Sequence, residues 1–285
     1  MKKLLFLFDT DPMPSVFDTV VGYDGGADRV TGYANVTPDN VDALVDGTIY
    51  TRGGKDKQNT AIFVGGGDIG KGEALFEAVK KRFFGPFRVS VMLDSNGSNT
   101  TAAAGVALLA KAKKLKGKKA VVLAGTGPVG MRAAAFLAGE GADVTITSRT
   151  AERAEIAAKA IEKRFGYKVK GVAGSTDAER TAAVKDANIV FAAGAIGVQL
   201  LPESAWKDNP NIELLADVNA QPPLGLEGTD ATDKGKERNG KLSFGALGIG
   251  GLKLKLHRGC IKQLFESSEG VFDAEQIYAL AKDMA

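Results

Sequence analysis

The sequence is poor in residues on which several classes of protein depend. It contains one cysteine, Cys260, which excludes internal disulfides and a cysteine metal cluster, so we expect a cytoplasmic protein. Because Cys260 lies in an apolar helical pattern, we expect a small buried side chain rather than a nucleophile. No residue pattern points to a bound metal ion.

Strong charge and long apolar runs are absent as well. The 37 basic and 34 acidic residues leave a net charge of +3, which gives nucleic-acid binding no support. No apolar run approaches the roughly 18 residues of a membrane span. Only five apolar residues follow Met1-Lys2-Lys3 before Asp9, too few for a signal peptide. We therefore expect neither a membrane nor a nucleic acid as a partner.

Glycine is abundant instead, with 36 residues that cluster at turns after apolar runs, as in proteins whose backbone approaches ligands closely. A chain of 285 residues is long enough for two domains. In residues 1–98, short apolar runs alternate with helical patterns, one of which we expect to begin at Thr37-Pro38-Asp39. The alternation predicts a parallel α/β sheet, whose ligands bind beyond the carboxyl ends of the strands. The predicted strands are Leu4–Phe8, Arg29–Tyr33, Thr60–Val64 and Arg88–Leu93.

A glycine motif organises the second half of the chain. The apolar run Ala120–Ala124 leads into Gly125-Thr126-Gly127-Pro128-Val129-Gly130, which is followed by a helical pattern over Met131–Gly139. Glycines at this spacing permit a tight turn, close approach of a pyrophosphate, and close packing of helix on strand. With a strand before it and a helix after it, the motif predicts a Rossmann-like dinucleotide site. The alternative is an ordinary glycine-rich turn.

The next strand indicates which dinucleotide is bound. Asp143–Thr147 ends in Ser148-Arg149, with Arg153 further on. A site for NAD usually has a carboxylate at this position, which bonds the ribose 2′-hydroxyl. A hydroxyl and a guanidinium would instead bind a 2′-phosphate, so we predict NADP. The alternative interpretation of Arg149 is a solvated surface charge.

Two further strand ends complete the predicted cofactor site. The strand Ile189–Ala193 ends in Gly194-Ala195, and we expect Ala193, Gly194 and Ala195 beside the nicotinamide ribose, unless they form a plain turn. We also assign Asn219, which follows the strand predicted over Ile212–Val218, to the cofactor. A hairpin is predicted around Asn239-Gly240.

The last informative stretch is rich in glycine and carries the chain's single histidine. Glycines 245, 248, 250 and 251 precede a helix that we expect to run to about Glu266. Lys253 and His257 stand four residues apart and share a helix face. An ammonium group near a helix N-terminus is electrostatically unfavourable, which suggests a ligand or an acidic partner. By residue type alone, a surface lysine and a packing histidine are the simpler interpretation.

Several of these stretches together resemble one family, over the whole chain. They are Leu5–Asp11, Ser15–Asp18, Val21–Asp28, Asn35–Asn40, Asp94–Thr101, Gly125–Gly130 and Phe244–Arg258. The chain resembles the NADP-dependent methylene-tetrahydromethanopterin dehydrogenases of methylotrophic bacteria, which are related in fold to the methylene-tetrahydrofolate dehydrogenases. The resemblance implies oxidation of the methylene carrier to its methenyl form on the formaldehyde oxidation route, with methylene-tetrahydrofolate as a second substrate.

The resemblance also implies an organisation. It divides the chain into a pterin-binding α/β domain over 1–105, on which 252–285 packs back, and a Rossmann-like NADP-binding domain over 106–251. The active site would lie in the cleft between them, and the protein would form a homo-oligomer, a trimer. Phe17 would pack on a flat ring, Thr101 would offer a hydroxyl, Lys253 would bond the pterin, and His257 would hold the pterin or Lys253. Core packing for Phe17 and a helix cap for Thr101 are the alternatives.

Cyclohydrolase activity is not expected. The folate relatives carry a catalytic lysine in a tyrosine-containing motif, and although Tyr50 precedes Lys55 here, the spacing differs. Two other functions stay open from the residues. One is an NADP-dependent dehydrogenase of another two-domain type, which would use a Lys–Asp pair such as Lys55 with Asp94. The other is a non-enzymatic NADPH sensor.

Overall fold

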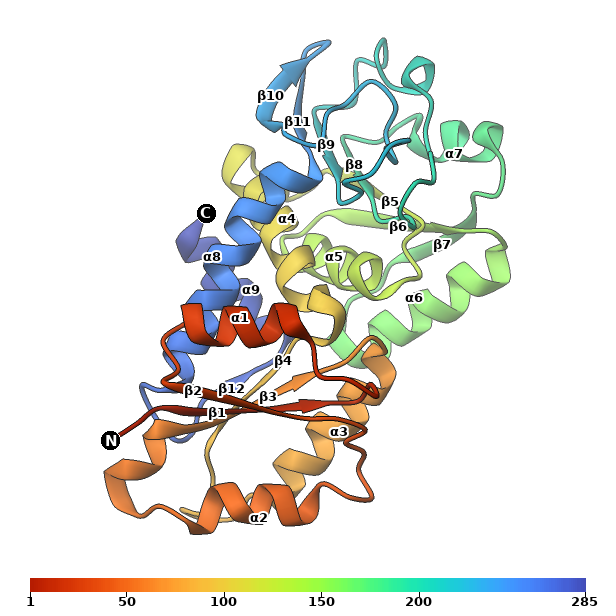
Figure 1. Ribbon diagram of the computed structural model, residues 1–285. Helices are drawn as coiled ribbons and strands as arrows, with labels where there is room; N and C mark the ends of the chain where they lie inside the picture. Colours follow the sequence, from red (N-terminus) through yellow and green to blue (C-terminus); the bar gives the residue numbers. More distant parts are fainter. The chain divides into compact units, whose positions relative to one another are not determined.

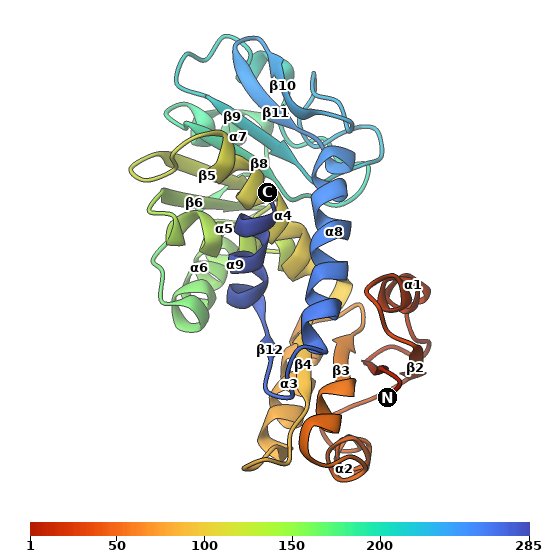
Figure 2. The same cartoon turned by 90° about the vertical axis from the view of Figure 1, so that its left-hand side faces the viewer.

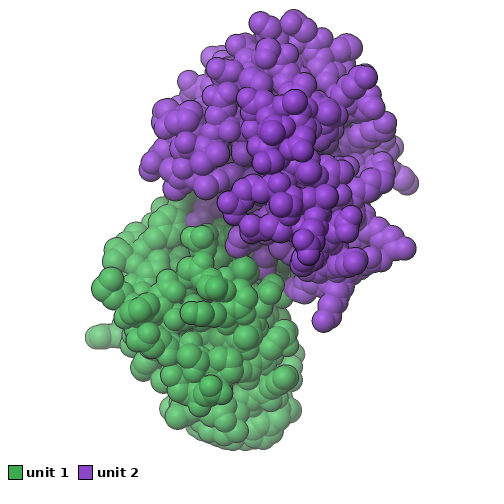
Figure 3. Space-filling view, turned by 90° about the vertical axis from the view of Figure 1, so that its right-hand side faces the viewer, with its two compact units in different colours: residues 1–100, 254–280 green, residues 101–253, 281–285 purple.

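The computed structural model describes residues 1–285, and the chain divides into two compact units. Unit 1 comprises residues 1–100 and 254–280, and unit 2 comprises residues 101–253 and 281–285 (Figure 3). Each unit is built on its own, largely parallel, sheet. None of the helices combines the length and apolar character that a membrane span requires.

Unit 1 is a five-stranded sheet in the order β12-β4-β3-β1-β2, and all four strand pairs are parallel. The parallel α/β sheet predicted for this part of the chain is confirmed. Its elements are β1 (Leu4–Asp9), α1 (Val16–Asp24), β2 (Arg29–Tyr33), α2 (Asp42–Tyr50), the 3-10 turn η1 (Gly54–Asn59), β3 (Thr60–Gly65), α3 (Ile69–Arg82), β4 (Ser90–Leu93), the 3-10 turn η2 (Ser95–Gly97) and β12 (Val271–Phe272).

Alternating side chains cover the two faces of this sheet. On one face, Phe8 and Ile62 join Leu75 and Phe76 of α3 in a buried core, and α2 completes this layer. Figures 1 and 2 show α2 and α3 together on this side of the sheet. Phe63, one residue along β3, points to the opposite face, as the two-residue period of a strand requires. Full burial of each such side chain contributes about 1.5–3 kcal/mol.

Two segments of unit 1 differ from the sequence prediction. Thr37 does not cap a helix: α2 begins at Asp42, and the Thr37 N–H donates to Asn40 Oδ1 at 2.8 Å in a separate turn. The side chain of Asn40 therefore closes the segment where the proline suggested a helix start. The strand β12 was not predicted. It has two residues, Val271 and Phe272, too few for a pattern to be visible, and it is specified by pairing with β4.

Unit 2 is a seven-stranded sheet in the order β10-β11-β9-β8-β5-β6-β7. All pairs are parallel except the β10–β11 hairpin, whose predicted turn at Asn239-Gly240 is confirmed. Its strands and helices are β5 (Lys119–Leu123), α5 (Pro128–Gly139), β6 (Asp143–Ser148), α6 (Ala151–Phe165), β7 (Lys170–Ala173), α7 (Asp177–Val184), β8 (Ile189–Ala192), the 3-10 turn η3 (Glu203–Ala205), β9 (Leu214–Asp217), β10 (Lys234–Arg238) and β11 (Lys241–Phe244).

Three helices contain residues of both units. They are α4 (Ser98–Ala112), α8 (Ala246–Leu264) and α9 (Ala274–Met284). Within unit 2, α4 packs closely on the sheet: a Cβ at Gly105 would lie 2.9 Å from the ring of Phe191 in β8. Helix α7 packs on the opposite face of the sheet, in a core that contains the fully buried Trp206.

The order of the strands locates the ligand side of unit 2. From β5 the chain runs outward through β6 and β7, then returns to the other flank of β5 to form β8 and β9. Such a reversal creates a crevice at the carboxyl ends of the two central strands. The segments after β5, β6, β8 and β9 all leave the sheet at this edge (Figure 1).

Candidate functional site

Three glycines at the start of α5 have different surroundings. A Cβ at Gly125 would lie 2.8 Å from Cβ of Ile146, and a Cβ at Gly130 would lie 2.7 Å from Cα of Gly125. These two glycines are therefore required by the packing of the turn and helix on the sheet. At Gly127 no atom lies within 4 Å of the Cβ position. The fold itself leaves space there, as a site for close approach of a ligand requires.

The first turn of α5 suits an anion. Gly127 is the N-cap residue, no side chain caps the helix, and Pro128 occupies the first turn. The N–H groups that begin a helix lack partners within it and attract negative charge. The open space at Gly127 and this helix start together fit the pyrophosphate of a dinucleotide.

A cavity of about 360 Å³ adjoins this turn in unit 2. Ser148, Arg149 and Arg153, the residues predicted at the 2′-phosphate end of the cofactor, line it together with Thr126 of the glycine motif. No acidic side chain lines the cavity. Both Arg149 and Arg153 are exposed to solvent, and Ser148 is buried. The chemistry of this lining fits a phosphate monoester.

The sequence prediction missed other members of the same lining. Ser175, Arg180 and Leu200 border the cavity from the segments after β7 and β8. These residues could not be predicted because neither segment contains a recognisable motif. Only the parallel sheet, which places the ends of β6 and β7 side by side, reveals the connection.

The segment after β8 is held in place by backbone and amide bonds. The Ala193 N–H donates to the Leu123 carbonyl at 3.0 Å, which fixes the segment beside the glycine turn. Gly194 packs against Leu200, since a Cβ there would lie 2.9 Å from Leu200 Cδ1. Asn219 is buried, and its Nδ2 donates to the Ala195 carbonyl at 3.5 Å. Asn219 thus ties the end of β9 to the predicted nicotinamide segment.

Asp217, the last residue of β9, organises the loop that contains Asn219. Its carboxylate accepts the N–H of Asn219 and the N–H of Leu226, each at 2.9 Å. Burial raises the pKa of Asp217, and these N–H bonds offset part of the rise. The carboxylate therefore serves the loop rather than a ligand.

The start of α8 is occupied by the protein's own backbone. The N–H groups of Leu247 and Gly248 donate to the Ala231 carbonyl, and the Gly245 N–H donates to the Asp233 carbonyl at 3.0 Å. A Cβ at Gly248 would lie 1.9 Å from the Asp233 oxygen. A Cβ at Gly245 would likewise lie 2.0 Å from the Asp230 carbonyl oxygen, so Gly245 and Gly248 are the glycines that leave room for the loop that caps the helix. By contrast, the Cβ positions of Gly250 and Gly251 have no neighbour within 4 Å.

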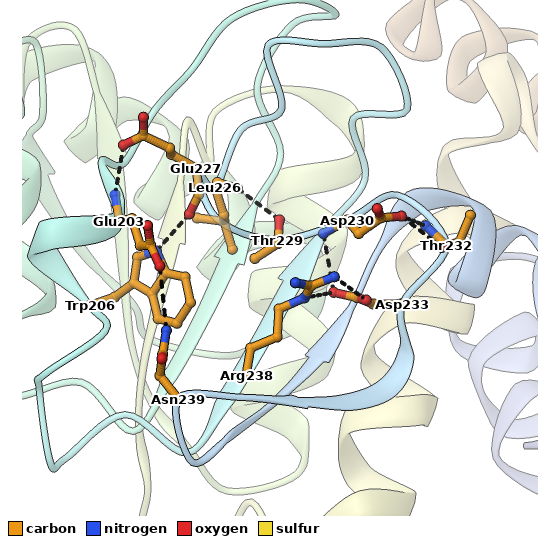
Figure 4. Close-up of polar contacts among 10 residues, drawn as sticks. All are labelled: Glu203, Trp206, Leu226, Glu227, Thr229, Asp230, Thr232, Asp233, Arg238 and Asn239. Atoms are coloured by element: carbon orange, nitrogen blue, oxygen red, sulfur yellow. Dashed lines mark hydrogen bonds and ion pairs between the residues drawn. The ribbon is translucent and has the colours of Figure 1, made fainter.

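An ion pair between half-buried Arg238 and buried Asp233 fixes that capping loop (Figure 4). Arg238 donates from Nε and Nη2 to the two oxygens of Asp233, at 2.5 and 2.8 Å. The Asp230 N–H also donates to Asp233 at 3.1 Å. Burial raises the pKa of Asp233, but the bond from Arg238 and its other bonds outweigh burial and lower the pKa overall. Lys253, half-buried, lies further along the helix that this loop anchors.

In unit 1, His257 of α8 lies in an aromatic setting. It is fully buried and stacks on Phe63, with ring centroids 5.3 Å apart and an interplanar angle of 19°. The ring of Phe17, on α1, lies 6.2 Å from it. Phe17 itself is 49% exposed. The structure thus brings two of the four predicted substrate residues together, one buried and one open to solvent.

Asp94 completes this group, a role that the sequence prediction did not assign. Its Oδ2 lies 3.9 Å from His257 Nδ1 and accepts the Thr100 hydroxyl at 2.6 Å. Its Oδ1 accepts the N–H groups of Asn99 and Thr100 at 2.9 and 3.1 Å. Asp94 therefore anchors the first turn of α4, where Thr101 follows, half-buried. Cys260 is buried as predicted, and burial raises the pKa of its thiol, with the charge of Asp94 adding to the rise.

Lys55 and Asp94 do not form the pair that one alternative function requires. Lys55 lies in η1, before β3, whereas Asp94 follows β4. Because β3 and β4 are parallel, these positions lie at opposite edges of the sheet. The separation is roughly the length of a six-residue strand, about 20 Å.

Comparisons with known proteins match the two halves of the chain to different families. Residues 16–96 match the family of the methylene-tetrahydromethanopterin dehydrogenase N-terminal domain, and residues 112–225 match an NAD(P)-binding family. Bifunctional protein MdtA of Methylorubrum extorquens is 71% identical over 286 residues, covering 100% of this chain and 99% of the relative. The NAD(P)-dependent methylenetetrahydromethanopterin dehydrogenase of the same organism is 32% identical over 281 residues, or 95% of each chain.

The chain belongs to the methylene-tetrahydromethanopterin dehydrogenase family. The family resemblance inferred from the sequence is confirmed, and unit 2 contains the NAD(P)-binding domain.

Solved structures of more distant proteins share the fold. The 5-ketofructose reductase of Gluconobacter sp. strain CHM43 aligns over 100% of this chain and 99% of its own, with a TM-score of 0.55 and 17% identity. Quinate dehydrogenase from Corynebacterium glutamicum aligns over 98% of each chain, with a TM-score of 0.53 and 14% identity. These likenesses confirm the predicted fold class, two α/β domains.

Proposed function

We propose that this protein oxidises methylene-tetrahydromethanopterin to the methenyl form, with NADP⁺ as the hydride acceptor, and that it also accepts methylene-tetrahydrofolate. The step belongs to formaldehyde oxidation. The observation that carries the proposal is the family match of residues 16–96 together with a full-length relative named for this dehydrogenase activity at 32% identity. The match over residues 112–225 supports the nucleotide half of the reaction.

The cavity in unit 2 supports NADP over NAD. Arg149 and Arg153 are exposed in its lining, Ser148 offers a hydroxyl, and no carboxylate is present to repel a 2′-phosphate. The backbone from Gly125 to Gly130 would hold the pyrophosphate, and Ala193 to Ala195 would border the nicotinamide ribose. When bound, NADP⁺ supplies the site that accepts the hydride.

The reaction makes modest demands on the protein's acids and bases. The methylene carbon lies between two ring nitrogens, and the lone pair of a nitrogen stabilises the cation left when a hydride departs. No proton has to be removed, so the protein's tasks are to orient two bulky rings and to exclude water. The absence of a Lys55–Asp94 pair is consistent with this chemistry.

We assign the substrate's flat ring system to the exposed face of Phe17. His257, buried next to Phe17 and stacked on Phe63, would support Phe17 rather than touch the substrate. Lys253 would bond the pterin, and Thr101 would offer its hydroxyl; both side chains are half-buried. The cleft between the domains, the trimer, the functional domain boundaries at 105 and 251, and the lack of cyclohydrolase activity stay predictions.

Neither alternative function has an observation in its favour. One alternative is a dehydrogenase that uses a Lys–Asp pair, and Lys55 and Asp94 of this protein do not form one. The other is an NADPH sensor, which would not need a substrate domain of the family that residues 16–96 match.

The test is an assay of NADP⁺ reduction by the purified protein with methylene-tetrahydromethanopterin and, separately, with methylene-tetrahydrofolate. We expect turnover with both carriers and a strong preference for NADP⁺ over NAD⁺. Folded protein that binds NADP⁺ but turns over neither carrier would refute the proposed reaction.

A further inference from the structure

Arg180 is the third arginine in the lining of the unit 2 cavity, and its surroundings differ from those of the other two. It lies in α7, and 12% of its side chain is exposed. Its Nη1 donates to the carbonyls of Gly174 and Ser175 at 2.8 and 2.9 Å. Its Nε donates to the carbonyl of Leu200, and its Nη2 donates to the carboxylate of Asp177.

These bonds occupy most of the guanidinium. An arginine has five N–H donors, and four bonds to the protein are made here. Its charge is also balanced by Asp177. A phosphate bound in the cavity would have to displace these contacts, whereas Arg149 and Arg153 are exposed. Arg180 is therefore poorly suited to bind the phosphate itself.

The carbonyls that Arg180 binds belong to two separate parts of the cavity lining. Gly174 and Ser175 follow β7, and Leu200 lies beyond β8, twenty residues after Arg180. Each part contacts a predicted cofactor segment. A Cβ at Gly174 would lie 2.8 Å from Cβ of Thr147, next to Ser148, and Leu200 packs on Gly194.

The segment after β7 is fixed from a second side as well. The carboxylate of Glu179 accepts the N–H groups of Ser175 and Thr176 at 2.7 and 3.0 Å, and the Thr176 hydroxyl accepts the Glu179 N–H. This reciprocal cap holds α7 to the loop before it. Because α7 and its loop form one fixed piece, the bond from Arg180 to Leu200 sets the spacing between that piece and the segment after β8.

We propose that Arg180 is a positioning residue for the dinucleotide. It joins the segment that borders the 2′-phosphate end to the segment that borders the nicotinamide ribose, and it makes no contact with the phosphate. The inference rests on the proposed NADP site. Loss of the guanidinium fork should therefore weaken binding of NADP and NAD alike, whereas loss of a direct phosphate ligand should weaken NADP alone.

The test is calorimetric titration of the apoprotein with NADP, NAD and 2′,5′-ADP, for the wild type, Arg180→Lys, Arg180→Ala and the control Arg149→Ala. Thermal melts of each apoprotein show that the variants are folded. We expect both Arg180 variants to raise the Kd of NADP and of NAD by the same factor, roughly tenfold. Lysine should not rescue binding, since one ammonium group does not reproduce the fork. Arg149→Ala should raise the Kd of NADP and 2′,5′-ADP and leave that of NAD unchanged.

Two results would overturn the inference alone. One is wild-type affinity for NADP and NAD in folded Arg180→Lys and Arg180→Ala. The other is a loss of NADP affinity with NAD affinity intact, which would make Arg180 a phosphate ligand. A wild-type protein that binds neither NADP nor 2′,5′-ADP would instead refute the proposed cofactor, and the inference with it.

Discussion

The substitution Gly127→Ala should affect NADP binding without disrupting the fold. The added methyl group would meet no protein atom within 4 Å, and Gly127 has φ −80° and ψ 170°, which any residue adopts. Folding is therefore expected to tolerate the change. Alanine has less freedom than glycine in the unfolded chain but is a poorer N-cap residue, so the two effects oppose each other and the free energy of unfolding should change by less than about 1 kcal/mol.

Binding of NADP should weaken much more than folding does. The methyl group would fill the space that we assign to the pyrophosphate beside the first turn of α5. A hydrogen bond to a charged group contributes about 1.5–3 kcal/mol, so the loss of one such bond raises the Kd of NADP roughly ten- to hundredfold.

The assay pairs calorimetric titration with NADP and urea unfolding of the apoprotein. Gly130→Ala is the matched control, since its methyl group would lie 2.7 Å from the backbone of Gly125. That variant should lose about 1–3 kcal/mol of unfolding free energy. If Gly127→Ala binds NADP as tightly as the wild type, the assignment of this space to the cofactor is wrong.

Four further predictions concern single side chains. Arg149→Asp should raise the KM for NADP far more than that for NAD, and equal effects in steady-state assays would refute its role at the 2′-phosphate. Lys253→Ala should lower kcat/KM for the pterin with an unchanged melting temperature; unchanged kinetics would make it a surface charge. The lowered pKa of Asp233 means that its pair with Arg238 stabilises the fold above pH ~4 and that this stability is lost as the pH falls through the folded-state pKa. The unfolding free-energy difference between wild type and Arg238→Gln should therefore shrink in acid, and a constant difference would contradict the assignment. Cys260, buried and with a raised pKa, should react with a thiol reagent at pH 8 only in denaturant; rapid labelling of the native protein would contradict its burial.

The features that the sequence predicted well are those that depend on local patterns. The apolar runs and helical periods located the strands of both sheets except β12, and the spacing of Gly125, Gly127 and Gly130 located the nucleotide turn. Ser148 and Arg149 were found because a rule connects the second strand of this fold to the ribose. In each case a few adjacent residues carry the whole signal.

The features that the sequence did not reveal depend on contacts between distant residues. Arg180 binds the Leu200 carbonyl twenty residues away, and nothing in either segment marks the partnership. The sequence offered Asp94 only as a partner for Lys55, because its bonds to Thr100 depend on how α4 leaves the sheet. The abundance of glycine at turns suggested close approach of ligands, but Gly248 makes room for the Asp233 carbonyl. A glycine pattern indicates that some group approaches the backbone closely, but it does not show whether that group is a ligand or another part of the protein.

The most direct test of the proposed reaction follows the hydrogen itself. Methylene-tetrahydromethanopterin deuterated at its methylene carbon is incubated with the protein and NADP⁺, and the NADPH is isolated and analysed by mass spectrometry and NMR. Direct hydride transfer predicts one deuterium on the nicotinamide ring of each NADPH formed. NADPH without deuterium, or no NADPH from folded protein that binds NADP⁺, would contradict the account.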